Sequence, residues 1–371
     1  MRKIGYWLLL VFLVLSCVPE LPVQPVPVDE GYPEGAKVTV HFSVTGSGCL
    51  PATKALGEKP ELDSLYLAVF GSSGYLKEYV KATIDHKPTY VDADTMMRFH
   101  ATLTLSDKER SVHFIGNGPS TLDFGYDTEI LPQLLSAGGG QAFWQMKKNI
   151  LIEGDKQQDG SYLPTDATNA QFANIPLIRN FSKIVLVNQE GSNFTPDSFA
   201  VFSVPAKGSV VPFHDGKFVE NYQDKGFTEL IAQYPGNLPD STDFMWDAGG
   251  WDTLRVEKDQ AVYLYERPKP TQQFMPTYVI VHGIYNNPED QNSEHNNKSY
   301  YYKIDLMQDG EYYPILRNFK YQIKINKILS IGHTSAQAAA ASAGSADVSA
   351  DITTSHLSDI SDGEEIGRAH V

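Results

Sequence analysis

The sequence has very little cysteine. Only Cys17 and Cys49 occur among 371 residues. Two cysteines are too few for the disulfide framework that stabilises many small exported proteins. We therefore expect the fold to depend on its core, and a content of 42% hydrophobic and 11% aromatic residues is ample for that.

Long hydrophobic runs are also scarce. The longest, Ile4 to Leu15, has about a dozen residues, whereas a membrane-spanning helix needs roughly twenty. Its length, with Arg2 and Lys3 before it, is typical of a signal peptide. The small residue Ser16 directly before Cys17 is the pattern that lipoprotein signal peptidase cuts, so we expect cleavage between Ser16 and Cys17. An ordinary secretory signal with a chance cysteine is the alternative.

Positive charge is in short supply. The chain has 30 Lys and Arg residues against 45 Asp and Glu, a formal charge of −15. Loss of the signal peptide removes two cations and leaves −17. Such a surface argues against nucleic acid as a partner and against electrostatic docking on anionic lipid. We therefore expect membrane contact only through acyl chains on Cys17, which anchor stably when two or more are present. Val18 carries no inner-membrane retention signal, so the prediction is a lipid-anchored protein of the outer membrane, displayed at the cell surface.

Motifs of catalysis are missing as well. The sequence has no His-Glu-x-x-His, no Cys-x-x-Cys, no P-loop and no Gly-x-Ser-x-Gly. We expect no catalytic residue, no cofactor and no metal site. His41, His100 and His113 fall within strand patterns, where core or surface packing is favoured over a role as metal ligands.

Three weaker signals leave alternatives open. Asp155 to Gly160 resembles a calcium loop but lacks its final glutamate, so a polar hairpin turn is favoured. The loop from Asn286 to Asn297 carries Glu289, Asp290 and Glu294, and we expect it to be solvated. A carboxylate pair for glycoside hydrolysis is defined in space, so the sequence neither names nor excludes one.

Aromatic residues are plentiful in the second half of the chain. They could stack on sugar rings, although packing within a β-sandwich is favoured. The residues concerned are Trp246, Trp251, Tyr300, Tyr301, Tyr302, Tyr312 and Tyr313.

The hydrophobic pattern of the rest of the chain is that of an all-β protein. In Lys37 to Val44 hydrophobic residues alternate with polar ones, as in a half-buried strand. Asp63 to Phe70 is more continuously apolar, which predicts a strand buried on both faces. Asp127 to Ser136 is the clearest candidate helix.

We expect two transthyretin-like β-sandwich domains in tandem, with minor helices. The predicted divisions are a signal peptide (1–16), a proline-rich tether (17–35), an N-terminal sandwich (36–173), a C-terminal sandwich (174–330) and a linker or the start of a truncated further domain (331–365). The final residues, 366–371, match the translation of a common sequencing adapter, and we expect them to be an artefact.

An internal similarity links two distant segments. Pro176 to Phe181 reads Pro-Leu-Ile-Arg-Asn-Phe, and Pro314 to Phe319 reads Pro-Ile-Leu-Arg-Asn-Phe. The separation is too long for a solenoid repeat. Two strands with similar structural roles are favoured over coincidence.

Four of these features together resemble the fimbrillin-like lipoproteins of Bacteroidetes, most closely the large Bacteroides branch whose fimbrillin region is followed by further domains. They are the signal peptide followed by the strand Lys37 to Val44, the segment Asp63 to Phe70, the segment Val112 to Asn117, and the pair of Arg-Asn-Phe strands.

The resemblance implies assembly by strand exchange. In polymerising members an Arg-directed protease cuts after the first strand, and a strand from another subunit fills the groove. The matching position here is Lys54 before Ala55, where the family has arginine. The chain also continues past Ser330, whereas polymerising members end in their donor strand. Both departures favour an anchor, tip or accessory subunit, or a stand-alone adhesin.

We therefore expect a non-catalytic surface lipoprotein whose partners are other fimbrial subunits, or glycans or proteins of a host or bacterial surface. The alternatives are a glycan-binding lipoprotein and a glycoside hydrolase with an unrecognised carboxylate pair.

Overall fold

The computed structural model describes residues 31–45, 62–87, 96–137, 140–232, 244–245, 250–267, 276–290, 292–308, 310–344 and 347–357. Ser16, Cys17, Lys54 and Ala55 lie outside these ranges, as does the tail 366–371. Within them, no helix has both the length and the apolar character to cross a membrane.

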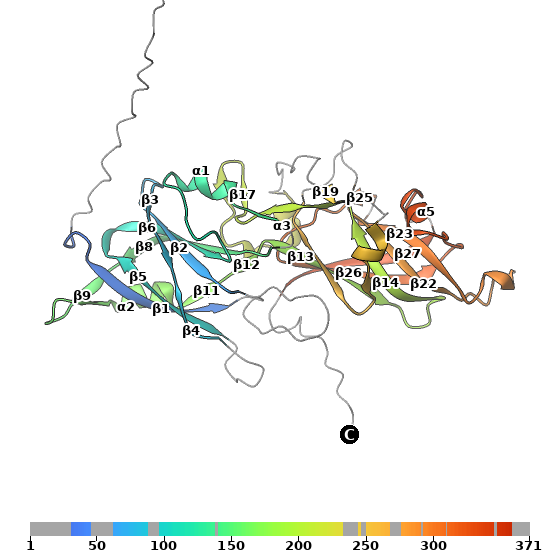
Figure 1. The fold of residues 1–371 in the computed structure, drawn as a ribbon, viewed down its shortest axis with the longest axis horizontal. Helices are drawn as coiled ribbons and strands as arrows, with labels where there is room; N and C mark the ends of the chain where they lie inside the picture. The colour runs from blue at the N-terminus through green and yellow to red at the C-terminus, as the bar shows by residue number, and fades with distance from the viewer. Residues whose placement is uncertain are drawn as a thin grey trace, which may run out of the picture.

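The first half of the chain forms two packed sheets, which we call the first sandwich (Figure 1). One sheet has the order β11-β1-β5-β4 and the other β12-β8-β6-β2-β3. The strands are β1 (Lys37–Thr45), β2 (Leu65–Phe70), β3 (Leu76–Lys81), β4 (Thr83–His86), β5 (Met97–Thr104), β6 (Ser106–Gly116), β8 (Phe143–Ile152), β11 (Asn174–Pro176) and β12 (Ile178–Arg179).

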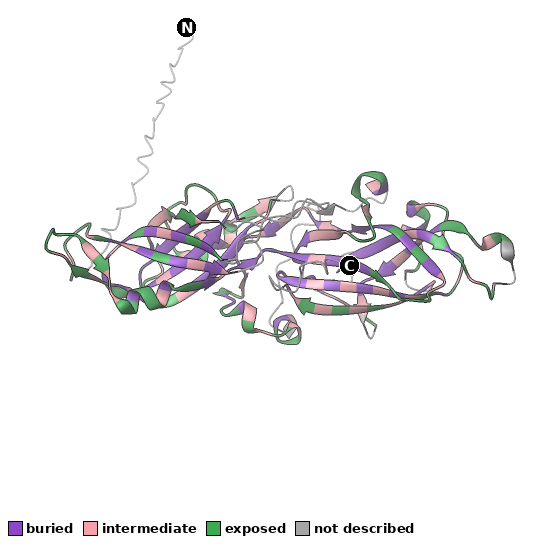
Figure 2. Ribbon diagram, turned by 90° about the horizontal axis from the view of Figure 1, so that it is seen from below, coloured by how far each residue is buried: buried purple, intermediate pink, exposed green. Residues whose placement is uncertain are grey.

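The second half forms another pair of sheets, the second sandwich. Their orders are β21-β13-β26-β27 and β20-β14-β22-β23. The strands are β13 (Phe181–Asn188), β14 (Phe194–Phe202), β20 (Val256–Glu257), β21 (Ala261–Tyr265), β22 (Tyr278–Tyr285), β23 (Lys298–Asp305), β26 (Phe319–Ile328) and β27 (Val348–His356). Buried residues run along the strands of both sandwiches, and exposed ones concentrate in the connections (Figure 2).

Short elements fill the connections. The helices are α1 (Asp127–Ile130), η1 (Leu131–Gln133), α2 (Asp166–Phe172), η2 (Tyr222–Asp224), α3 (Phe227–Ala232), α4 (Trp251–Leu254), η5 (Ser293–His295) and α5 (Ala336–Ala340). The short strands are β7 (Leu135–Ala137), β9 (Gly154–Lys156), β10 (Tyr162–Pro164), β15 (Val204–Pro205), β16 (Lys207–Ser209), β17 (Phe213–His214), β18 (Lys217–Phe218), β19 (Phe244–Met245), β24 (Met307–Gln308) and β25 (Glu311–Tyr312).

The all-β prediction is confirmed, and so is the buried strand at Asp63 to Phe70. Every residue of β2 is buried. Leu65, Leu67 and Val69 join the core of the first sandwich, while Ala68 and Phe70 join the larger core that continues into the second half of the chain. A strand covered on both faces needs no polar alternation, which is why its sequence is continuously apolar.

The internal similarity also has a structural meaning. The strands that follow the two Arg-Asn-Phe words, β13 and β26, are parallel neighbours in one sheet, from Lys183 opposite Lys320 to Asn188 opposite Ile325. The prediction of two strands with similar roles is confirmed. Asn318 adopts a left-handed backbone (φ 59°), which asparagine tolerates better than most residues, and its N–H donates to the carbonyl of Phe181 (2.8 Å).

Two local predictions are wrong. The helix expected over 127–136 ends at Ile130, becomes a short 3-10 turn and then a strand, because Pro132 removes a backbone donor and clashes with a continuing α-helix. The second concerns the linker or start of a truncated further domain expected over 331–365, of which residues 331–344 and 347–357 are described. Their strand β27 pairs antiparallel with β26 along almost its whole length, and Ala339 of α5 is fully buried. Low sequence complexity did not prevent packing, since small alanines fit closely against the sheet.

The division into two domains at 173/174 stays a prediction. Strands β11 and β12 lie after that point, yet they pair with β1 and β8 of the first sandwich. The two halves are also joined by β7 and β16, which pair through Ser136 opposite Gly208. A Cβ on Gly208 would lie 2.4 Å from the ring of Tyr265, so glycine is required for this close approach.

A buried ion pair holds this junction. Arg317 is completely buried and Glu266 is 8% exposed. The Arg317 Nε donates to Glu266 Oε2 (2.7 Å), and a second guanidinium nitrogen donates to the other carboxylate oxygen. The same guanidinium donates to the carbonyls of Ser209 (2.9 Å) and Val210 (2.8 Å), so it fixes the segment that follows β16.

Removing one partner of this pair should strongly destabilise the protein. We expect Arg317→Ala to lower the free energy of unfolding by about 3–5 kcal/mol, because it leaves Glu266 buried without its cation. Arg255→Ala is the matched control, since that arginine is 45% exposed and 4.0 Å from Glu257; its cost should stay below about 0.5 kcal/mol. Chemical denaturation measures both. Equal losses in the two variants would contradict the proposed role.

Candidate functional site

The first strand occupies the middle of its sheet. β1 pairs antiparallel with β5 from Lys37 opposite Thr104 to Val44 opposite Met97. On its other side Ser43 to Thr45 pair in parallel with β11. Hydrogen-bonded neighbours therefore flank β1 on both sides.

The inner face of β1 fills an apolar groove. Val38, Val40, Phe42 and Val44 are at most 4% exposed, and they pack with residues of both sheets of the first sandwich. The Phe42 ring lies 5.9 Å from the ring of Phe99 and makes an edge contact at 5.7 Å with another phenylalanine, Phe114. Alternate residues of Lys37 to Val44 are therefore buried between the two sheets of the first sandwich.

The size of this burial decides how β1 can behave. Burying one large apolar side chain contributes about 1.5–3 kcal/mol, so four contribute roughly 6–12 kcal/mol as an upper estimate. Without β1 the groove would expose this surface together with the unpaired backbone edges of β5 and β11. Such an edge binds another strand readily. Exchange of β1 for another strand of similar alternation stays a prediction.

The outer face of β1 shows a cluster that the sequence did not reveal. The sequence predicts core or surface packing for His41 and His100, and 58 residues lie between them in the chain. The structure places them opposite each other, and both contact Asp85 of β4. Only the strand pairing brings them together, so no sequence spacing could have identified them.

His113 is a core residue, one of the two roles, core or surface packing, that its strand pattern predicts. Its side chain is completely buried and its Nδ1 accepts a hydrogen bond from Trp144 Nε1 (3.2 Å). Its Nε2 lies 4.0 Å from Asp127 Oδ2, too far for a hydrogen bond. Burial lowers the pKa of His113 to about 3 and raises the pKa of Asp127. The histidine is therefore neutral at pH 7, and the two residues do not form an ion pair.

The tyrosines are mostly engaged in packing. Tyr300 and Tyr302 of β23 are buried in the core of the second sandwich. Tyr301 lies on the other face, where its ring makes an edge contact with the buried Trp251 (5.2 Å). The preference for packing over a sugar-binding platform is confirmed for these residues; Trp246 lies outside the described residues.

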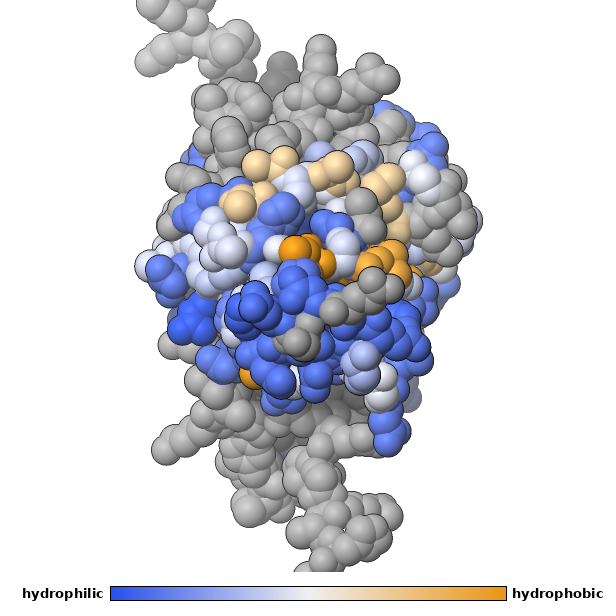
Figure 3. Space-filling model, turned by 90° about the vertical axis from the view of Figure 1, so that its right-hand side faces the viewer, coloured by the Kyte–Doolittle hydropathy of each residue, from blue (hydrophilic) through white to orange (hydrophobic). Residues whose placement is uncertain are grey.

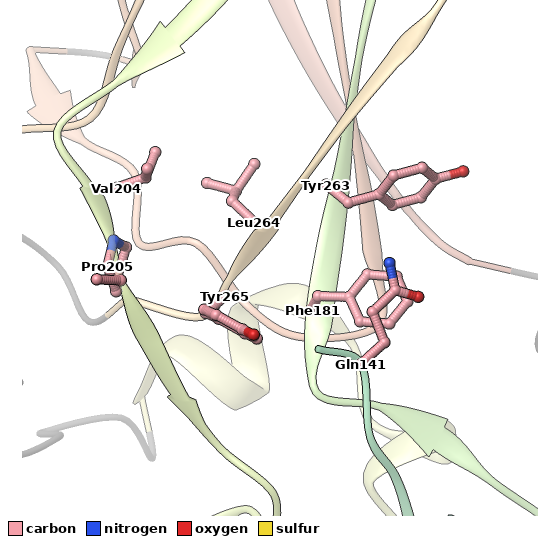
Figure 4. A pocket seen from close by; sticks show the side chains of 8 residues that line it. Gln141, Phe181, Val204, Pro205, Tyr263, Leu264 and Tyr265 are labelled. Atoms are coloured by element: carbon pink, nitrogen blue, oxygen red, sulfur yellow. The ribbon is translucent and has the colours of Figure 1, made fainter. Parts of the chain in front are cut away.

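A hollow near the junction of the halves is apolar but small. Figure 4 shows Phe181 and Tyr263 on one side of it and Val204 and Pro205 on the other. Its cavity volume is about 80 Å³, well below the roughly 300–1,000 Å³ of small-molecule sites. We therefore do not assign it a glycan.

The acidic segments behave as expected. Asp155 to Gly160 belongs to the hairpin of β9 and β10, and Asp159 Oδ1 accepts from the backbone N–H of Ser161 (2.9 Å) just beyond the turn. In the loop after β22, Asp290 accepts from the N–H of Asn292 (2.9 Å) and contacts His295. Figure 3 shows that the end of the molecule formed by the second sandwich is largely hydrophilic.

Comparison with known structures identifies the class of fold. A candidate cell adhesion protein from Parabacteroides distasonis matches with a TM-score of 0.50 and 16% identity, over 90% of this chain and 100% of that chain. A fimbrilin from Porphyromonas gingivalis W83 matches with a TM-score of 0.50 and 13% identity, over 85% of this chain and 96% of that chain. No family model and no curated protein sequence matches this chain. The protein thus has the fold of fimbrillin-type proteins, which confirms the resemblance at the level of fold.

The buried histidine should leave a signature in the pH dependence of stability. Below pH 6.5 His113 is protonated in the unfolded chain, whereas in the folded chain it stays neutral until the pH falls to about 3. Stability from this group is therefore fully present above pH 6.5 and is lost as the pH falls, at up to about 1.4 kcal/mol per pH unit. We expect His113→Gln to flatten the profile between pH 6.5 and 5, measured by urea denaturation relative to the wild type. Parallel profiles would show that His113 is not the group responsible.

Proposed function

We propose that this protein is a non-catalytic, lipid-anchored surface protein of fimbrillin type, acting as a fimbrial anchor, tip or accessory subunit or as an adhesin through β-strand complementation. The single observation that supports this most is β1, a strand with neighbours on both sides whose alternate side chains fill a groove. The fimbrillin-type fold agrees with it. Its partners would be other fimbrial subunits, or surface proteins or glycans.

The choice among these roles rests on Lys54. The argument from a C-terminal linker no longer applies, since β27 pairs within the second sandwich. An Arg-directed protease has no arginine at the position that matches the family's cleavage site, so the segment from Cys17 to Lys54 should remain attached. An uncut first strand keeps its groove filled, which suits an anchor or tip better than a shaft subunit.

The alternatives receive less support. The tyrosines proposed as a glycan platform are largely packed, as described above. Among the described residues, the buried carboxylates are Glu266 and Asp305, and each lies beside a basic side chain, Arg317 and Lys303 respectively. Neither arrangement favours a sugar-binding or hydrolytic site.

Lipid anchoring can be tested with the two cysteines. We expect Cys17→Ser to lose the acyl chains and leave the membrane fraction, whereas Cys49→Ser should behave as the wild type. Mass spectrometry of the mature wild-type protein should find acylated Cys17 at the N-terminus with the peptide through Lys54 intact. A new N-terminus at Ala55 would identify a polymerising subunit and contradict the anchor or tip role.

Strand complementation can be tested in trans. A variant lacking residues 31–45 should expose the groove and lose cooperative unfolding. Adding a synthetic peptide of Lys37 to Thr45 should restore it, because the peptide supplies both the backbone ladder and the buried side chains. A control peptide with Val40→Asp and Phe42→Asp should not. If both peptides restore the transition, or neither does, the groove does not act by strand insertion.

A further inference from the structure

Three potential metal ligands meet on the outer face of one sheet. They are His41 of β1, His100 of β5 and Asp85 of the edge strand β4. His41 lies directly opposite His100, and Thr83 of β4 lies opposite His100 on its other side. Asp85 lies in a bulge of β4, between Ile84 opposite Phe99 and His86 opposite Arg98, and its carboxylate contacts both imidazoles.

Strand alternation explains why these side chains point outward. Val40 and Phe42 face the core on either side of His41, and Phe99 and Ala101 do so on either side of His100. Successive side chains alternate between the two faces of a strand, so the histidines must project from the outer face. The side chains of His41, His100 and Asp85 are 69%, 33% and 34% exposed, so an ion from solution can reach them.

Both imidazoles direct the same nitrogen at the carboxylate. His100 Nδ1 lies 2.6 Å from Asp85 Oδ1, and His41 Nδ1 lies 3.3 Å from Asp85 Oδ2. The two rings are 5.5 Å apart and inclined at 45°. One ligand atom from each residue lies within 4.8 Å of the other two.

We propose that His41, Asp85 and His100 bind one divalent transition-metal ion, zinc being the expected one. Tetrahedral zinc with ligand bonds of about 2.0–2.2 Å places its ligand atoms roughly 3.3 Å apart. The separation of His41 from Asp85 already has this value. His100 instead contacts the other carboxylate oxygen, Asp85 Oδ1. Small rotations of these exposed side chains would bring both imidazole nitrogens to this separation from a single oxygen of Asp85.

The ligand types set the selectivity. Two imidazoles and one carboxylate suit zinc, copper and nickel, whereas calcium and magnesium prefer sites made entirely of oxygen. Three protein ligands leave a fourth position for water or for a group from another molecule.

Two similar pairs in the same protein provide an internal comparison. His282 lies 2.9 Å from Asp197, and His295 lies 3.1 Å from Asp290. Each has one imidazole and one carboxylate, and among the described residues only the cluster on β1, β4 and β5 brings together three such groups. Simple pairs should bind metal much more weakly than the three-residue site.

The site would connect three strands. A ligand that binds only the folded arrangement stabilises it in proportion to its concentration above the dissociation constant. Bound metal would therefore hold β1 against β4 and β5. If β1 is the exchangeable strand, a consequence that rests on the proposed function, metal would oppose its release.

The test uses the full mature chain in detergent, carrying a tag without histidine. Isothermal titration with Zn²⁺ should show one site, and His41→Asn and His100→Asn should each weaken it at least tenfold. His295→Asn is the matched control and should leave the affinity for Zn²⁺ unchanged. Titration with Ca²⁺ in place of Zn²⁺ should show no binding at the site. Far-UV circular dichroism with a chelator present verifies that each variant is folded.

Hydrogen exchange provides a second readout. Zn²⁺ should slow exchange in peptides covering β1 and β4 in the wild type and not in His100→Asn. Absence of one-equivalent binding, or binding that both variants retain, would overturn the proposal and leave a hydrogen-bonded surface cluster only. Neither result depends on proteolysis or strand exchange, so the proposed function stands or fails separately.

Discussion

The rest of the structure depends on one buried charge. A guanidinium taken out of water is costly unless it is paired and all its donors are used, and Arg317 meets both conditions with Glu266 and the carbonyls of Ser209 and Val210. Arg317 lies just before β26 and Glu266 directly after β21, whereas Ser209 is the last residue of β16 and Val210 follows it. Since β16 also pairs with β7, the same ion pair fixes the position of the second sandwich against the first half of the chain.

This rigid junction contrasts with the first strand. Along its two edges β1 is joined to its neighbours by backbone pairing, and on its inner face it makes apolar contacts. Another strand of similar pattern can reproduce both kinds of interaction. On its outer face, His41 belongs to the cluster with Asp85, and the hydroxyl of Thr39 is hydrogen-bonded to that of Thr102 (2.9 Å). If β1 is exchangeable, as proposed, an ion bound at the cluster across β1, β4 and β5 would link retention of β1 to the composition of the surrounding solution.

Periodicity in the sequence predicted much of this. The alternation of hydrophobic and polar residues predicted the strand β1, and a continuous apolar run predicted that β2 is buried on both faces. Both patterns depend only on which face of a strand is exposed to water. The repeated Arg-Asn-Phe words predicted two strands of similar role, which proved to be parallel neighbours. The prediction of a helix failed at Asp127 to Ser136, where Pro132 ended it. After Ser330, the alanines of α5 pack beside Phe202 and Tyr278, and β27 pairs with the edge of β26; both contacts depend on the tertiary structure.

The sequence by itself determined the class of the fold: an all-β chain with an acidic composition and too few cysteines for a disulfide framework. These properties follow from composition and local pattern. Tertiary structure alone decided the contacts between residues far apart in the chain. Arg317 meets Glu266, and His41 meets Asp85 and His100, because strand order and register bring them together, and neither can be read from the spacing of residues along the chain.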